Sequence, residues 1–243
     1  MYVIGVTGGI ASGKSTLCSM LSEIIKSIGH YHLAVIDADK LGHLAYAVGG
    51  PCYTTIVEHF GAQIVAENGE INRRVLGGIV FSDPQKLREL EAIVWPAIRG
   101  FIQKDLSVLS QKENDNPCVP VIVIIEAAVL LEAGWSSLCD SMWVVYVDPL
   151  LARERLMVRN SLSEQEADKR IKVQMTNSER LANLRECDFS INNSGSSASF
   201  KIAVNEVFHK FMSKINPFFN FISPLISQSR AENADSSIPL QPL

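Results

Sequence analysis

A glycine-rich segment near the start constrains this chain more than any other feature. Residues 8–15 read GGIASGKS and fit the pattern G-x-x-x-x-G-K-[ST]. An apolar run at 2–6 precedes the segment, and apolar residues at helical spacing follow it at 16–21, so strand, turn and helix are predicted in the required order. Backbone N–H groups in such a turn, together with the helix N-terminus, face an anion. We therefore predict a phosphate-binding loop; the alternative is a turn that merely begins a helix.

The loop supplies the first candidate site residues. Lys14 is placed to reach the β- and γ-phosphates of a nucleotide, and the Ser15 hydroxyl is placed to ligate Mg²⁺. Gly8 and Gly13 let the backbone curl around the anion. The predicted nucleotide-binding residues are Gly8, Gly9, Ile10, Ala11, Ser12, Gly13, Lys14, Ser15 and Thr16.

Composition excludes several classes of protein. The chain of 243 residues is 47% hydrophobic and 20% charged with a net charge of −4, which is typical of a soluble globular protein and not basic enough to favour a nucleic-acid partner. No apolar stretch reaches the roughly 20 residues that span a bilayer, so no membrane association is expected. The five cysteines are odd in number and form no C-x-x-C pair, which favours reduced thiols and a cytoplasmic location. Because a strand is expected from residue 2, we expect no cleavable targeting peptide.

The rest of the chain alternates strand-like and helix-like segments. Further apolar runs at 33–36, 119–125, 142–147 and 189–191 predict an α/β fold with a five-stranded, doubly wound parallel sheet. A helical insertion is expected at about 42–115, with its longest helical run interrupted at Pro96, and a charged segment at about 153–186 contains the capping box of Ser163 and Glu166. The last helix is marked by Ile202, Val204, Val207, Phe208, Phe211 and Ile215. We expect 1–215 to form the folded unit and 216–243 a flexible tail.

Acidic residues end two of these strands. The second ends in Asp37-Ala38-Asp39, and ligands of an open parallel sheet bind at this carboxyl edge. An extended chain would project both aspartates from one face, where Asp39 could accept a proton or hold the water shell of a metal; the alternative is that Asp39 caps the next helix. Glu126 ends the third strand and is a candidate for orienting Mg²⁺, or a solvated acid. Whether Asp37 or Glu126 assists the metal is left open.

Two arginines follow the fourth strand. Arg155 and Arg159 are four residues apart and share a helix face, from which Arg153 is excluded. If this segment closes over the loop as a lid, the two guanidinium groups would neutralise charge on a transferring phosphoryl group. A solvated basic helix is the alternative.

Several of these segments together resemble the dephospho-CoA kinase family. The resemblance covers residues 2 to about 214 and lies in TGGIxSGKS at 7–15, VIDAD at 35–39, NRRVL at 72–76 with Val80-Phe81, Gln174, Arg180 and INNSG at 191–195. AAVLLEAGW at 127–135 and the Trp95-Pro96 pair look most like the kinase domain of the animal bifunctional CoA synthase. Many bacterial members instead have His-Pro at the latter position, and P-L-L-F-E where this chain has residues 128–132.

The resemblance implies a P-loop kinase with a helical acceptor domain at about 42–115 and a helical lid at about 153–186. The implied activity is ATP- and Mg²⁺-dependent phosphorylation of the ribose 3′-hydroxyl of dephospho-CoA, the last step of coenzyme A biosynthesis. Lys14, Asp39, Arg155 and Arg159 would be catalytic, with Asp39 as the base, and Arg74 would contact the acceptor's phosphates. The implied state is a monomer or weak homo-oligomer. Two alternatives are another P-loop small-molecule kinase, such as a nucleoside monophosphate kinase, and a non-catalytic ATP-binding regulator.

Overall fold

A five-stranded parallel sheet forms the centre of the molecule. The computed structural model describes residues 1–215, and the predicted tail at 216–243 lies outside the described residues. The strands are β1 (Tyr2–Gly8), β2 (His32–Asp37), β3 (Val121–Glu126), β4 (Ser141–Tyr146) and β5 (Phe189–Asn192). They pair in the order β2-β3-β1-β4-β5, every pair being parallel. The predicted five-stranded parallel sheet is confirmed.

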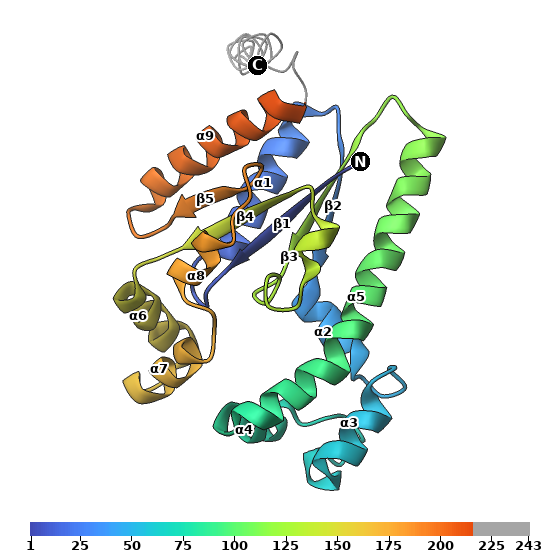
Figure 1. Ribbon diagram of the computed structural model, residues 1–243, viewed down its shortest axis with the longest axis vertical. Coiled ribbons are helices and arrows are strands. Elements are labelled where there is room, and N and C mark those ends of the chain that lie inside the picture. Colours follow the sequence, from blue (N-terminus) through green and yellow to red (C-terminus); the bar gives the residue numbers. More distant parts are fainter. Residues whose placement is uncertain (216–243) are drawn as a thin grey trace, which may run out of the picture.

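Helices cover both faces of this sheet (Figure 1). They are α1 (Lys14–Ile28), α2 (Ala38–Ala45), α3 (Tyr53–Phe60), α4 (Arg73–Ser82), α5 (Pro84–Asp115), α6 (Pro149–Asn160), α7 (Glu164–Lys172), α8 (Asn177–Ala182) and α9 (Ser197–Ile215), with short 3₁₀ turns at Ala62–Ile64 and Trp135–Leu138. Alternate residues of β3 enter different cores: Val123 packs with α5, and Ile124 packs with α1 and α9. Two buried faces explain why the strand is continuously apolar, and the doubly wound arrangement is confirmed.

The prediction of an interruption at Pro96 is wrong. Residues 84–115 form one helix, α5, with Pro96 in its interior. A proline within a helix removes one backbone hydrogen bond and disfavours the helix by roughly 3 kcal/mol. Val94, Ile98 and Ile102 are buried around it. We infer that their packing offsets this loss, because each buried aliphatic side chain contributes about 1.5–3 kcal/mol.

Helices α6, α7 and α8 connect β4 to β5 and stand beside the sheet (Figure 1). The predicted capping box of Ser163 and Glu166 is confirmed at the start of α7. In α9 the prediction for Ile202 is wrong, since this side chain is 61% exposed; Phe200, which lies on the buried face, packs against the sheet instead. Among residues 1–215, no helix has the length and apolar character that a membrane crossing needs.

Candidate active site

The loop at 8–15 lies at the carboxyl end of β1, the central strand of the sheet. Gly13 begins α1 with a positive φ of 100°, and Gly8 has a φ of 155°. Neither position has room for a side chain, because a Cβ on Gly8 would collide with the backbone oxygen of Val145 and one on Gly13 with the amide of Asn193. The two glycines are therefore required by the fold of the loop.

Lys14 folds back over this loop. Its Nζ donates hydrogen bonds to the backbone oxygens of Gly8 at 3.1 Å and Gly9 at 3.2 Å. Burial lowers the pKa of the Lys14 ammonium, although the neighbouring carboxylates of Asp39 and Glu126 partly offset that effect. A desolvated cation whose hydrogen bonds go to two carbonyl oxygens is a strong attractor for a phosphate group.

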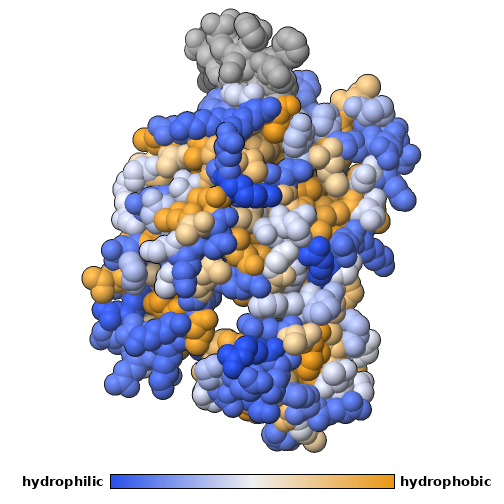
Figure 2. Space-filling view, viewed as in Figure 1, coloured by the Kyte–Doolittle hydropathy of each residue, from blue (hydrophilic) through white to orange (hydrophobic). Residues whose placement is uncertain are grey.

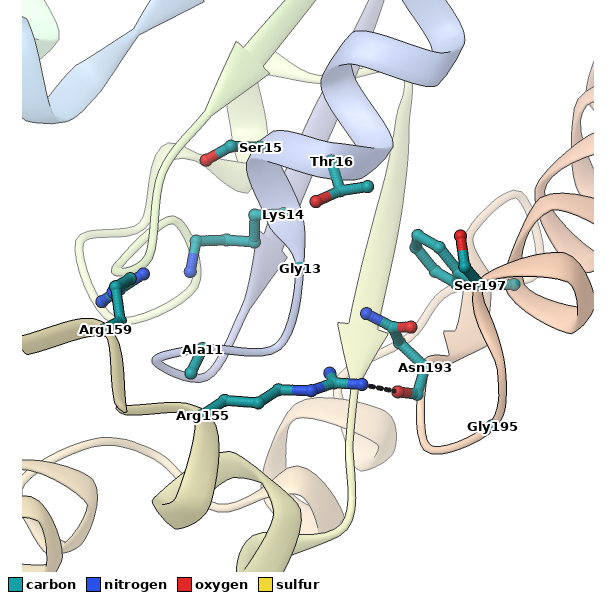
Figure 3. Close-up of a pocket in the computed structure, with 11 residues that line it drawn as sticks. Ala11, Gly13, Lys14, Ser15, Thr16, Arg155, Arg159, Asn193, Gly195 and Ser197 are labelled. Carbon is teal, nitrogen blue, oxygen red and sulfur yellow. Dashed lines mark hydrogen bonds between the residues drawn. The ribbon is translucent and has the colours of Figure 1, made fainter. Parts of the chain in front are cut away.

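A pocket of about 400 Å³ opens beside the loop (Figure 3). Both predicted lid arginines line it: Arg155 donates to the backbone oxygen of Asn193 at 3.0 Å, and the side chain of Arg159 extends toward the same part of the pocket as Lys14. The remaining lining residues are Ala11, Gly13, Lys14, Ser15, Thr16, Asn193, Gly195, Ser197 and Phe200. Arg153 faces away and pairs with Glu164 and Asp168 of α7. The structure thus brings Lys14, Arg155 and Arg159 together.

Four of the predicted nucleotide-binding residues have other surroundings. Gly8, Gly9, Ile10 and Ser12 do not line this pocket. The Ile10 N–H donates to Oε1 of Gln174 at 2.8 Å, and the Ser12 backbone oxygen accepts from Nδ2 of Asn193 at 2.8 Å. These contacts tie the loop to the segments that follow α7 and β5, so they fix its shape.

Ser15 and Glu126 form the candidate metal site. The Ser15 hydroxyl donates to Oε1 of Glu126 at 2.6 Å. Asp37 is aligned with Glu126 in the β2–β3 register, at the same edge. Mg²⁺ usually binds through one or two carboxylates plus substrate phosphates and water, so this donor set fits it. No cluster of three or more His, Cys, Asp or Glu side chains that could hold a metal ion occurs within residues 1–215.

The Asp37-Ala38-Asp39 segment does not stay extended, so the condition for both aspartates to project from one face is not met. Helix α2 begins at Ala38, and Asp37 is its N-cap, with its side chain accepting from the N–H of Lys40 at 3.1 Å. The cap expected as an alternative for Asp39 is therefore made by Asp37. Asp39 lies in the first turn of α2, where a negative charge is favoured by the helix dipole.

Asp39 interacts electrostatically with Lys14 of the loop and also lines a second pocket. This pocket, of about 460 Å³, is lined by aromatic and aliphatic side chains together with Asp39, His43 and Glu91. The Asp39 side chain contacts solvent but also has protein around it, and this partial desolvation raises the pKa of the carboxyl. The positive charge of Lys14 lowers the pKa but does not cancel the effect of desolvation. An acid with a raised pKa beside a cation and an apolar pocket is a candidate proton acceptor.

A buried arginine completes the surroundings of the loop. Arg180 is 1% exposed, its Nη2 lies 3.3 Å from Oε1 of Glu132, and its Nη1 donates to the Met175 backbone oxygen. Nη1 also lies 3.6 Å from the point where Gly9 would carry a Cβ. The sequence resemblance included Arg180 without giving it a role, and nothing local in the sequence identifies Glu132 as its partner, because the two are 48 residues apart.

A doubly wound sheet, a phosphate loop with its lysine, and a helix that brings two arginines to the same pocket define this protein as a P-loop kinase. The model of the dephospho-CoA kinase family matches residues 2–199. The chain belongs to the dephospho-CoA kinase family.

Individual relatives agree with this membership. A dephospho-CoA kinase of Symbiobacterium thermophilum is 40% identical over 196 residues, covering 81% of this chain and 75% of that relative. One from Geobacter sulfurreducens is 40% identical over 210 residues, covering 86% of this chain and 98% of the relative. Among solved structures, dephospho-CoA kinase from Campylobacter jejuni is similar with a TM-score of 0.59 and 28% identity, over 88% of this chain and 98% of that one.

Proposed function

We propose that this chain transfers the γ-phosphoryl group of ATP to the ribose 3′-hydroxyl of dephospho-CoA, giving CoA and ADP, the last step of coenzyme A biosynthesis. Family membership supports this activity. The observation that carries it is the position of Asp39, which interacts electrostatically with Lys14 of the loop and also lines the second pocket. A proton acceptor between a phosphate site and an organic pocket is the arrangement that phosphoryl transfer to a hydroxyl needs.

The loop and the arginines supply the nucleotide site. Lys14 would leave the carbonyl oxygens of Gly8 and Gly9 and bind the β- and γ-phosphates. Arg155 and Arg159 would add positive charge to that of Lys14 in the same pocket, where negative charge on the transferring group is spread. We add Arg180, which lies against Gly9 and whose guanidinium Nε is buried without a partner in the part of the chain that the structure describes.

Asp39 would act on the acceptor. Its carboxylate accepts the 3′-hydroxyl proton while the oxygen forms a bond to the γ-phosphorus, and the bond from that phosphorus to the β–γ bridging oxygen breaks to release ADP. Because phosphoryl transfer proceeds through a loose transition state in most analyses, the proton need not leave early. The main contribution of Asp39 is then orientation of the hydroxyl together with late removal of its proton.

Ser15 and Glu126, with Asp37 at the same edge, would hold Mg²⁺. When bound, the ion neutralises charge on the β- and γ-phosphates. The chain's part is to direct the Ser15 hydroxyl and the Glu126 carboxylate to one point, which their 2.6 Å hydrogen bond supports.

The pocket that contains Asp39 supports the assignment of the acceptor domain. Helices at about 42–115 would form the acceptor domain, since α2 and α5 line the pocket that contains Asp39, and helices at about 153–186 would form the lid. We propose that the protein acts in the cytoplasm as a monomer or weak homo-oligomer on ATP and dephospho-CoA, without a nucleic-acid or membrane partner. The net charge of −4 supports the lack of a nucleic-acid partner.

An acceptor scan tests the proposal. ADP release from ATP·Mg²⁺ is measured with dephospho-CoA, with nucleoside monophosphates and without acceptor, and the product is examined by ³¹P NMR for a new 3′-phosphomonoester. We expect turnover with dephospho-CoA only. Turnover with a nucleoside monophosphate alone would favour another small-molecule kinase, and ATP binding without turnover on any acceptor would favour a regulator.

A further inference from the structure

Ala11 has an unusual backbone conformation within the phosphate loop. Its φ is 58°, in the left-handed region. Among residues 1–215 the other non-glycine residue with a positive φ is Ser161, which ends α6, a common place for this conformation. Ala11 follows a strand, and its methyl group cannot form the local hydrogen bonds that let asparagine or aspartate adopt the left-handed region. Ala11 is therefore held in a conformation that its own side chain disfavours.

This conformation shapes the nucleotide pocket. Gly13 also has a positive φ, of 100°, whereas Ser12 between them does not. Backbone that alternates in this way turns successive N–H groups to one side, where they form a concave site for an anion. Ala11 and Gly13 both line the pocket that Lys14 lines. The left-handed Ala11 is therefore part of what makes the loop a phosphate site.

Two amide side chains from outside the loop hold the residues on either side of Ala11. On one side, Oε1 of Gln174 accepts from the Ile10 N–H at 2.8 Å. On the other side, Nδ2 of Asn193 donates to the Ser12 backbone oxygen at 2.8 Å. The two contacts span 164 and 181 residues of sequence, so they depend on the tertiary fold. They fix the chain immediately before and immediately after the strained residue.

Gln174 belongs to the segment between α7 and α8, which lies against the loop. Its Oε1 is 3.9 Å from the point where Gly9 would carry a Cβ, and Nη1 of Arg180 is 3.6 Å from the same point. Helices α6 and α7 form a lobe beside the sheet (Figure 1), and Figure 2 shows a hollow between this lobe and the lobe of α3 and α4. The segment that carries Gln174 thus supports the loop from the side of the α6–α7 lobe.

We propose that Gln174 is a positioning residue for the nucleotide: together with Asn193, it keeps Ala11 in the left-handed conformation before ATP binds. The inference rests on the proposed function, which assigns phosphate binding to this loop. Without such contacts, an alanine favours an ordinary conformation by a factor of roughly 5–30. The affinity for nucleotide would fall by the same factor, because only the fraction of molecules with the correct loop conformation binds it.

The test replaces the amide of Gln174 by a side chain of similar length. Gln174→Met removes the acceptor for the Ile10 N–H and keeps the bulk beside Gly9. We expect the Kd for the non-hydrolysable analogue AMPPNP with Mg²⁺, measured by calorimetry, to rise by about fivefold, the lower end of the range because Asn193 keeps its hydrogen bond. Val173→Ala, at the neighbouring position with a side chain that is 42% exposed, is the matched control and should bind AMPPNP as the wild type does.

Ala11→Gly separates this role from a merely structural one. Glycine adopts a positive φ about as readily as a negative one, so Gln174→Met should weaken AMPPNP binding by less than about twofold when Ala11→Gly is also present. A merely structural role of Gln174 would give the same loss of affinity with and without Ala11→Gly. Ala11→Gly alone should raise the melting temperature by about 2–4 °C, because it removes a strained alanine. This last measurement does not depend on the folding of Gln174→Met.

Three results would overturn the inference. They are wild-type affinity in Gln174→Met, a loss of affinity that Ala11→Gly does not reduce, and a melting temperature that Ala11→Gly does not raise. Failure of the proposed function would be recognised separately, because AMPPNP binding needs no acceptor. A wild type that binds AMPPNP but does not phosphorylate dephospho-CoA would reject the proposed function, and the same affinities would still decide the role of Gln174.

Discussion

The buried pair of Arg180 and Glu132 allows stability and catalysis to be separated by mutation. Arg180 is 1% exposed and the Glu132 side chain is 21% exposed, and Oε2 of Glu132 is buried without a hydrogen-bond partner among residues 1–215. Glu132→Leu would therefore leave a buried cation without its counter-charge, and Arg180→Met would leave a carboxylate whose oxygen atoms have lost their cation. We expect both single variants to lose stability.

The magnitudes follow from the burial of this pair. Removing one partner of a fully buried pair is destabilising by about 3–5 kcal/mol. Arg180 keeps a second acceptor, the Met175 backbone oxygen, so we expect about 3 kcal/mol for Glu132→Leu. For Arg180→Met we expect about 3–5 kcal/mol, because Oε2 of Glu132 is buried without a hydrogen-bond partner in the described residues. Glu132→Leu/Arg180→Met should lie within about 1 kcal/mol of wild type, because exchanging both ions for apolar side chains is often close to neutral.

Across the two single variants and the double variant, turnover should not change in parallel with the free energy of unfolding. If the Arg180 guanidinium contributes charge at the loop, Arg180→Met and the double variant should both lose on the order of 10² in turnover, even where the double variant has regained its stability. Chemical denaturation and ADP release measured on the same preparations provide the test. Strictly additive stability losses would show that the pair is not coupled, and wild-type turnover in the double variant would make Arg180 purely structural.

Three further outcomes are expected. Lys14→Ala should reduce turnover by on the order of 10² or more, while its unfolding free energy stays within about 1 kcal/mol of wild type, because the lost cation is desolvated and its lowered pKa shows that the fold disfavours its charge. Asn193→Ala removes the hydrogen bond to the Ser12 oxygen and should cost about 1–3 kcal/mol with a raised KM for ATP, measured by denaturation and steady-state kinetics. The pKa of Asp39 is raised, so the folded state favours the protonated carboxyl, and the free energy of unfolding falls as the pH rises through the titration of this group. The melting temperature of Asp39→Asn should therefore equal that of the wild type at acid pH and exceed it at pH 7, as measured by thermal denaturation.

The sheet could be predicted from the sequence because each of its strands is an apolar run followed by a helical segment. This alternation predicts the number of strands and their parallel arrangement. It does not give the order β2-β3-β1-β4-β5, in which β3 lies between β2 and β1 although the long helical insertion separates it from both in the chain. One prediction failed where tertiary packing outweighs a local signal. Pro96 is a local helix breaker, but burial of Val94 and Ile98 keeps α5 intact. The second failure has a local cause: Ile202 lies out of phase with Val204 and Phe208 in the helix period, so it faces solvent, while Phe200 is in phase with them and packs inward.

The site was predictable where chemistry is local in the chain. The phosphate loop and the spacing of Arg155 and Arg159 indicated residues that the structure does place in one pocket. Contacts between distant segments gave no such signal. Asn193 donates a hydrogen bond to Ser12, which is 181 residues away in the sequence. Glu132 and Arg180 are 48 residues apart, and only the tertiary fold brings them into contact. Their individual roles in catalysis stay predictions.

The central claim is that Asp39 accepts the proton of the acceptor hydroxyl beside the phosphate loop. Asp39→Asn keeps the shape of the side chain and removes its basicity. General-base catalysis is typically worth 10²–10⁴, and a loose transition state favours the lower end. We predict that single-turnover phosphorylation of dephospho-CoA by Asp39→Asn falls by about 10²-fold, with the affinity for ATP·Mg²⁺ nearly unchanged. Phosphorylation at the wild-type rate would contradict the claim, and a marked loss of nucleotide affinity would assign Asp39 to the metal instead.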